Sequence, residues 1–187
     1  MMRTHKEIFK ITMSAIFLAI AFILPFLTGQ IAEIGSQLCP MHLPVLLCGF
    51  ICGWTYGLVV GLCAPLIRSQ ILSMPPLYLT ALCMSFELAT YGVVSALMYK
   101  ILPNKKGFIY VALLIAMLAG RIVWGMSMFM CVGLNFQKFG LNAFISGALL
   151  NAIPGIILQI ILVPILVIVY NKVFRKNNEV ENGKKRK

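Results

Sequence analysis

The sequence predicts an all-α integral membrane protein with six transmembrane helices. Hydrophobic residues make up 60% of its 187 residues, and the mean hydropathy is +0.94. Only 11% of the residues are charged, whereas a soluble domain has about 25%. The apolar residues fall in runs that approach or exceed the roughly 20 residues that a helix needs to cross a bilayer. Too few residues lie outside these runs to form a large soluble domain.

Six apolar runs define the expected spans. They are Ile8–Leu27, Met41–Trp54, Leu58–Leu72, Leu77–Lys100, Phe108–Cys131 and Leu141–Tyr170. The second is short for a full crossing, and residues 53–57 are expected to form the turn after it. The sixth is longer than a bilayer needs, so we expect it to tilt or to bend at Pro154 or Pro164. Residues 1–172 then form a single six-helix membrane domain, followed by a basic tail, residues 173–187, that is expected to be disordered.

Basic residues predict how the chain is oriented in the membrane. Sixteen Lys and Arg against five Asp and Glu give a net charge of +11. In a soluble protein this excess would suggest nucleic acid, but here the basic residues gather at the ends of the apolar runs, so no nucleic-acid partner is expected. Thirteen of them lie on the side of the termini, against Lys138 alone in the opposite loops, besides Arg68 and Arg121 inside the spans. Because basic loops stay in the cytoplasm, we expect both termini to be cytoplasmic.

The sequence lacks the motifs of common enzyme and metal sites. It has no Ser-His-Asp set, no His-Glu-x-x-His, no paired aspartates for a metal and no phosphate loop. Its six cysteines are scattered, without a Cys-x-x-Cys pair, and we interpret most of them as small residues of the membrane interior. We therefore expect no enzyme activity, no cofactor and no metal site. A channel is disfavoured because the cytoplasmic half of the spans is apolar.

One acidic residue, Glu87, lies near the middle of the fourth span. A carboxylate at that depth costs on the order of 3 kcal/mol on insertion scales, so it should face the protein interior beside a partner. Arg68 and Arg121 are the candidate partners. At about 1.5 Å per residue, Glu87 lies roughly 15 Å below the outer end of its span, with Arg121 and Asn151 at similar depth. His42 opens the second span at the outer surface, so these polar residues all fall in the outer half or at the middle of the membrane.

Two interpretations of this constellation stay open. Glu87 and Arg121 can form an ion pair that only holds helices together. Two arginines against one glutamate leave a positive charge, however, which favours a ligand or water nearby. We therefore expect an outward-facing pocket for a small polar molecule, with an aromatic wall. The candidate substrate-binding residues are His42, Arg68, Glu87, Tyr91, Arg121, Trp124 and Asn151.

Four stretches of the chain carry a family resemblance. They are Ala15-x-x-x-Ala19; residues 40–46 with Gly49, Gly53 and Gly57; residues 74–76 followed by 86–92; and residues 151–159. In this order they resemble the substrate-binding S components of energy-coupling factor (ECF) vitamin transporters, over nearly the whole chain. One departure is Trp54, which follows Gly53 where many members of the family have Gly-Pro. It affects only the local geometry of that turn.

The resemblance implies a role in vitamin uptake across the prokaryotic cytoplasmic membrane. In such proteins the first loop, here Thr28–Pro40, closes over a substrate bound at the outer side. The whole protein then topples to bring the site to the cytoplasm. A transmembrane T subunit and two cytoplasmic ATPases supply the energy, and Ala15 and Ala19 match the small-residue motif that docks on the T subunit.

The substrate implied is a B-vitamin or a related micronutrient. The additional arginine makes an anionic compound such as pantothenate the first candidate, while pyridoxine-type compounds, hydroxymethylpyrimidine and a queuosine-type base stay open. Two other classes compete with this interpretation. A stand-alone secondary carrier would use an ion gradient without ATPase partners, and a structural membrane subunit would bind no ligand.

Overall fold

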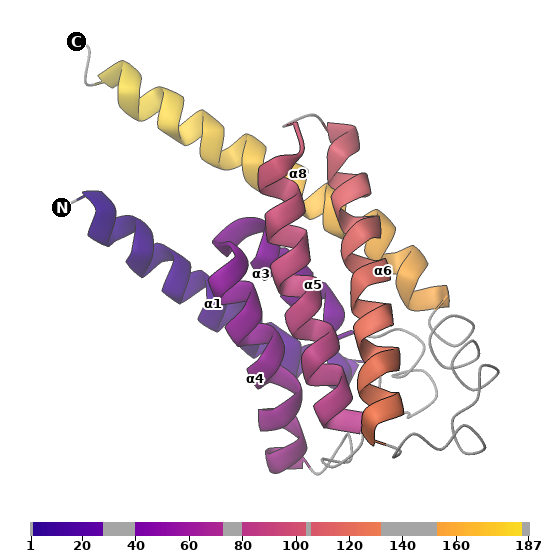
Figure 1. Cartoon of the computed structure of the whole chain (residues 1–187). Helices are drawn as coiled ribbons and strands as arrows, with labels where there is room; N and C mark the ends of the chain where they lie inside the picture. Colours follow the sequence, from indigo (N-terminus) through magenta and orange to yellow (C-terminus); the bar gives the residue numbers. More distant parts are fainter. Residues whose placement is uncertain (1, 28–39, 73–79, 104–105, 132–152, 185–187) are drawn as a thin grey trace.

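The computed structural model describes residues 2–27, 40–72, 80–103, 106–131 and 153–184, and these residues form six helices (Figure 1). The helices are α1 Met2–Leu27, α3 His42–Cys52, α4 Trp54–Leu72, α5 Leu82–Ile101, α6 Lys106–Cys131 and α8 Ile153–Lys184. All of them except α3 are long and apolar enough to cross a membrane. The predicted all-α membrane fold is therefore confirmed, whereas the side of the membrane that the termini face stays a prediction.

Helix α3 is the centre of the bundle. Every residue of α3 except Ile51 is buried, and α1, α4, α5 and α8 pack around it. Its 11 residues give a length of about 16 Å, roughly half the thickness of the hydrocarbon core. Because other helices rather than lipid cover its apolar side chains, α3 does not need the length of a full crossing. This accounts for the short second run in the sequence.

The turn between α3 and α4 is tighter than the sequence predicted. Residues 53–57 were expected to form it, but α4 begins at Trp54 and Gly53 alone reverses the chain. Gly53 has a φ of 101°, which a residue with a Cβ rarely adopts. Its N–H donates to the Gly49 carbonyl at 3.2 Å, and its own carbonyl accepts from the Gly57 N–H at 3.0 Å. One glycine therefore ends α3 and starts α4.

Glycines bring α4 and α5 into direct backbone contact. A Cβ added at Gly57 would meet the Gly92 carbonyl oxygen at 2.7 Å, and one added at Gly61 would meet the backbone of Leu88 and Ala89 at 2.6 Å. Small residues at such positions let helices approach closely in a membrane protein. The two contacts also set the register of this antiparallel pair, because moving four residues along α4 moves three or four residues back along α5. The middle of α5 is thereby fixed deep inside the bundle.

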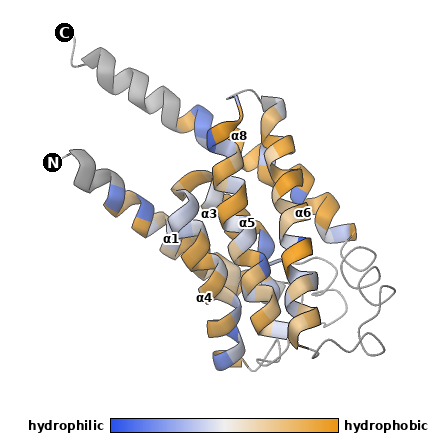
Figure 2. Cartoon of the chain, viewed as in Figure 1, coloured by the Kyte–Doolittle hydropathy of each residue, from blue (hydrophilic) through white to orange (hydrophobic). Residues whose placement is uncertain are grey.

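Hydrophobic residues predominate along the helices of the bundle (Figure 2), and many large apolar side chains are exposed. On α6 and α8, Leu118, Ile122, Ile157 and Ile161 are each more than half exposed. An apolar surface of this extent is unfavourable in water, so lipid is its natural solvent.

The first and last helices are longer than the predicted spans. Helix α1 starts at Met2 rather than Ile8, and α8 continues past Tyr170 to Lys184. Helix α8 thus extends into the basic tail, whose Lys, Arg and Glu residues are good helix formers. The disorder of residues 173–187 stays a prediction. Both extensions leave the bundle toward the same side (Figure 1).

Hydrogen bonds tie both long helices to the bundle where these extensions leave it. The Tyr56 hydroxyl of α4 donates to Glu7 Oε2 of α1 at 2.9 Å. Asn171 Nδ2 of α8 donates to the Tyr99 hydroxyl of α5 at 2.6 Å. The segments 28–39, 73–79 and 132–152 lie outside the described residues, and with them the predicted lid loop and the predicted starts of the fourth and sixth spans.

Candidate functional site

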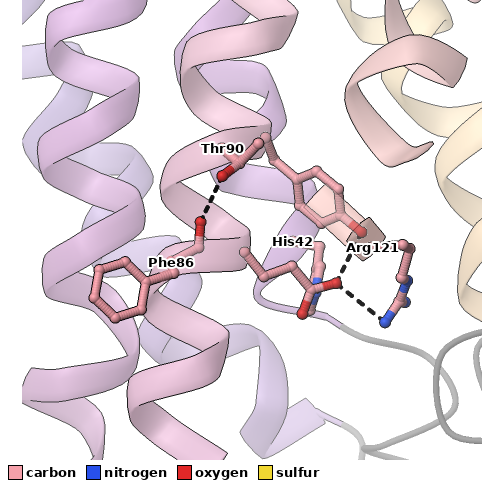
Figure 3. A network of polar contacts seen from close by, with 6 residues as sticks. His42, Phe86, Thr90 and Arg121 are labelled. Carbon is pink, nitrogen blue, oxygen red and sulfur yellow. Dashed lines mark hydrogen bonds and ion pairs between the residues drawn. The ribbon is translucent and has the colours of Figure 1, made fainter. Parts of the chain in front are cut away.

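Glu87 of α5 is the focus of polar contacts inside the described bundle. The residue is 1% exposed. Its Oε1 atom accepts the Tyr91 hydroxyl at 2.9 Å, and Arg121 Nη1 of α6 lies 3.0 Å from the same oxygen. His42 Nε2, from the first residue of α3, lies 3.5 Å from it. Figure 3 shows this cluster, with His42 and Arg121 labelled and dashed lines for hydrogen bonds and ion pairs. Three helices thus converge on one oxygen atom.

Arg121 compensates the buried charge of Glu87. At 3.0 Å and an effective dielectric constant of about 20, the two charges attract by about 5–6 kcal/mol. This attraction offsets desolvation, which costs several kcal/mol for each ion. The Tyr91 hydroxyl adds a charge-assisted hydrogen bond. Arg121 is therefore the predicted partner that the structure brings to Glu87.

The sequence predicted His42 at the outer surface of the membrane domain, but in the structure its side chain is buried. It is 2% exposed, and its ring packs at a tilt against Tyr91, with centroids 5.3 Å apart and planes at 57°. The 3.5 Å separation from Glu87 exceeds the usual N–H···O hydrogen-bond distance of about 2.7–3.2 Å. Neither ring nitrogen has a hydrogen-bond partner among the described residues. Since an unsatisfied buried group costs about 1–3 kcal/mol, the imidazole has capacity for a further polar group.

The Tyr91 ring lies against α6 where that helix has no side chain. A Cβ at Gly120 would overlap the edge of the Tyr91 ring. Gly120 directly precedes Arg121, so one turn of α6 both admits the tyrosine ring and supplies the guanidinium. The sequence analysis missed Gly120. The sequence feature that could have pointed to Gly120 is a glycine next to a charged residue inside an apolar run.

Arg68, the other predicted cation, lies on α4 nearer the end of the bundle than Glu87. It is 9% exposed. Extending the α4–α5 register that the glycines define places residue 68 opposite residues 81–82 of α5. That level is roughly 8 Å along the helix from Glu87. Arg68 therefore adds a second buried positive charge between the Glu87 cluster and the end of the bundle where α4 ends and α5 begins.

The remaining predicted site residues are placed in part. Trp124 follows Arg121 by three residues on α6 and is half-buried, whereas Asn151 lies outside the described residues. Gln159 of α8, two turns after Asn151 in the sequence, is 2% exposed. Contact of these residues with a substrate stays a prediction. Within the described segments, no group of three or more His, Cys, Asp or Glu side chains could hold a metal ion.

Helices of membrane-spanning length around a buried charged cluster define a multi-pass membrane protein with an internal polar site. A family model described as "ECF transporter, substrate-specific component" matches residues 9–167, and the chain belongs to this family of transporter subunits. Such a component binds a substrate for transport and is not an enzyme. Searches of curated proteins and of solved structures found no match. The predicted family is therefore confirmed, while its substrate is not identified.

Proposed function

We propose that this S component binds a B-vitamin or related micronutrient at the Glu87 cluster and delivers it to an ECF module. The observation that carries the proposal is the arrangement of His42, Glu87 and Arg121 inside the bundle. Holding helices together needs only one cation beside one carboxylate. Here the buried imidazole of His42 also lies beside this carboxylate, and neither of its ring nitrogens has a hydrogen bond within the described residues. A bound molecule with polar groups would satisfy it.

The unused atoms indicate which ligand chemistry fits. Within the described residues, the polar contacts of Glu87 all reach Oε1, which leaves Oε2 to accept an N–H or O–H of a ligand. The His42 ring can donate from one nitrogen and accept at the other. The Tyr91 ring and the half-buried Trp124 add aromatic surface. A small, flat or hydroxylated molecule carrying both donors and acceptors matches this set.

Charge makes pantothenate the first candidate. The described interior carries two arginines, Arg68 and Arg121. A guanidinium binds a carboxylate by strong charge-assisted hydrogen bonds, and pantothenate has both a carboxylate and hydroxyl groups. Pyridoxine-type compounds, hydroxymethylpyrimidine and a queuosine-type base provide the neutral alternatives to be tested beside it.

Energy for transport is assigned to partner chains. The sequence has no phosphate loop, so ATP would be hydrolysed by the two ATPases of the ECF module, joined to this chain through the T subunit. Ala15 and Ala19 lie one turn apart on α1, and both are exposed. An exposed pair of small residues at this spacing suits close packing of a partner helix in the membrane.

Native mass spectrometry of the protein purified alone in mild detergent tests the proposal. We expect a co-purifying vitamin-like molecule at near-stoichiometric amount, identified by fragmentation. Calorimetric titration with the four candidate compounds then measures affinity. Tyr91→Phe should weaken binding, because it removes the hydroxyl that orients Glu87. Tyr99→Phe is the matched control, since this tyrosine of the same helix bonds Asn171 at the other end of the bundle. Bare protein that ignores the whole panel would contradict the proposal.

Uptake by cells that contain the chain with or without its ATPase partners tests the energy source. We expect accumulation of the identified vitamin only when both ATPases and the T subunit are present. Accumulation by the chain alone, abolished by an ionophore, would contradict coupling to an ECF module while leaving the binding site intact.

A further inference from the structure

Cys83 and Cys131 meet where α5 begins and α6 ends. Their sulfur atoms lie 3.8 Å apart, although the residues are separated by 48 positions in the sequence. Cys83 is buried, and Cys131, the last residue of α6, is half-buried. Sulfur atoms in a disulfide are about 2.0 Å apart, so a small movement of the two side chains would close the gap. The sequence had suggested only small packing residues.

The sulfur contact joins the two helices that carry the Glu87–Arg121 ion pair. Cys83, Glu87 and Tyr91 are spaced four residues apart and share one face of α5. These three residues contact Cys131, Arg121 and Gly120 of α6, respectively. Cys83 precedes Glu87 by one turn, about 6 Å along α5, whereas Cys131 follows Arg121 by ten residues, about 15 Å along α6. The cysteine pair lies at the end of the bundle that the charge pattern assigns to the outer side of the membrane.

We propose that Cys83 and Cys131 are a thiol–disulfide pair that reversibly joins α5 to α6. The Cys131 thiolate, the more exposed of the two, attacks a small-molecule disulfide, forms a mixed disulfide and releases one thiol. The Cys83 sulfur then attacks the Cys131 sulfur and releases the second thiol. One disulfide bond forms and one breaks, and the two cysteine protons leave on the two released thiols. A dithiol reductant reverses both steps.

The disulfide would join the start of α5 to the end of α6 without changing the contacts of Glu87. It closes the chain between residues 83 and 131 into a loop and holds the two helices that carry Glu87 and Arg121. Closing a loop of this length restrains the unfolded chain and raises stability. Oxidation should therefore raise Tm and leave the Glu87–Arg121 ion pair in place. The inference depends on the α5–α6 contact and not on the identity of the substrate.

The experiment uses the full chain, reduced and purified in mild detergent. It is incubated with oxidised glutathione or with dipyridyl disulfide, which enters micelles more readily, and free thiols are then alkylated. Digestion and mass spectrometry should find residues 83 and 131 in one linked pair of peptides that lacks two hydrogen atoms. Tm should rise on oxidation and return on reduction.

Single variants provide the controls. Cys83→Ser and Cys131→Ser should each abolish both the linked peptides and the Tm shift. The Cys83→Ser chain still contains Cys131 and, on α4, the half-buried Cys63 as a control thiol, and we expect no link between these two cysteines. Any of three results would overturn the proposal. Both cysteines of the native protein could still be alkylated after treatment with both reagents. Cys131 could remain as a mixed disulfide, or either cysteine could link to a different cysteine.

Discussion

Replacing Arg121 with alanine removes the cation from a carboxylate that has no access to water. Arg121 Nη1 lies 3.0 Å from Glu87 Oε1, and Glu87 is 1% exposed. In the variant, the Tyr91 hydrogen bond and the His42 contact stay, but the carboxylate loses its nearest cation. Removing one partner of a buried ion pair costs about 3–5 kcal/mol, in line with the attraction of about 5–6 kcal/mol at an effective dielectric constant of about 20. We expect a large fall in Tm and a loss of ligand binding.

A double-mutant cycle separates the structural part of this effect from the binding part. Glu87→Gln with Arg121→Met removes both charges while keeping side-chain volume, so the double variant should be more stable than Arg121→Ala. It should still fail to bind ligand. Thermal unfolding in detergent, followed by tryptophan fluorescence, gives the coupling between Arg121→Met and Glu87→Gln. If the destabilisation of these two single variants simply adds, the ion-pair argument is wrong. If the double variant binds ligand as the wild type does, the cluster is not the substrate site.

Three further substitutions test the packing, the docking face and the histidine. Gly92→Ala should destabilise the protein by about 1–3 kcal/mol in thermal unfolding, because the new Cβ would press against the Gly57 backbone. Gly107→Ala is the control, since a Cβ at Gly107 would meet no atom within 4 Å. This variant should be neutral or stabilising by up to about 1 kcal/mol. Ala15→Trp should block co-purification with the T subunit while Ala15→Ser retains it, and equal recovery of both would move the docking face elsewhere. His42→Phe removes two nitrogens that have no hydrogen-bond partner among the described residues. It should therefore leave Tm unchanged or higher by an amount equivalent to about 1–3 kcal/mol, yet weaken ligand binding in calorimetry. Unchanged affinity would exclude the imidazole from the site.

Much of the candidate site could be predicted from the sequence because charges are rare in membrane spans. A carboxylate inside a span needs a partner, and Arg68 and Arg121 were the cations at a depth similar to that of Glu87 in the predicted spans. The choice between them depended on which residues of α5 and α6 face each other, and helical spacing alone does not give that register. Tyr91 was predicted to belong to the site because it lies one helical turn after Glu87. Trp124 and Asn151 were named from depth and helix face, and their contact with a substrate stays a prediction.

Two contacts escaped the sequence analysis for the same reason. Gly120 matters because the Tyr91 ring occupies the space that a side chain would fill, and Cys83 matters because Cys131 lies beside it. Each is a property of two residues on different helices. From the sequence, a glycine or a cysteine in an apolar run is interpreted as an ordinary packing residue. Only the residues that face it on the neighbouring helix show that Gly120 and Cys83 differ from other glycines and cysteines.

The sequence by itself determined the class of protein, since the hydrophobic effect and the cost of burying charge act on each span separately. It set which runs are apolar, that α3 is too short to cross, and that one carboxylate needs a cation. The tertiary structure decided what depends on packing between helices. It placed α3 at the centre with His42 buried, packed α4 against α5 at glycines, and paired Glu87 with Arg121. These outcomes depend on distances of a few ångströms between segments far apart in the chain, which no local pattern encodes.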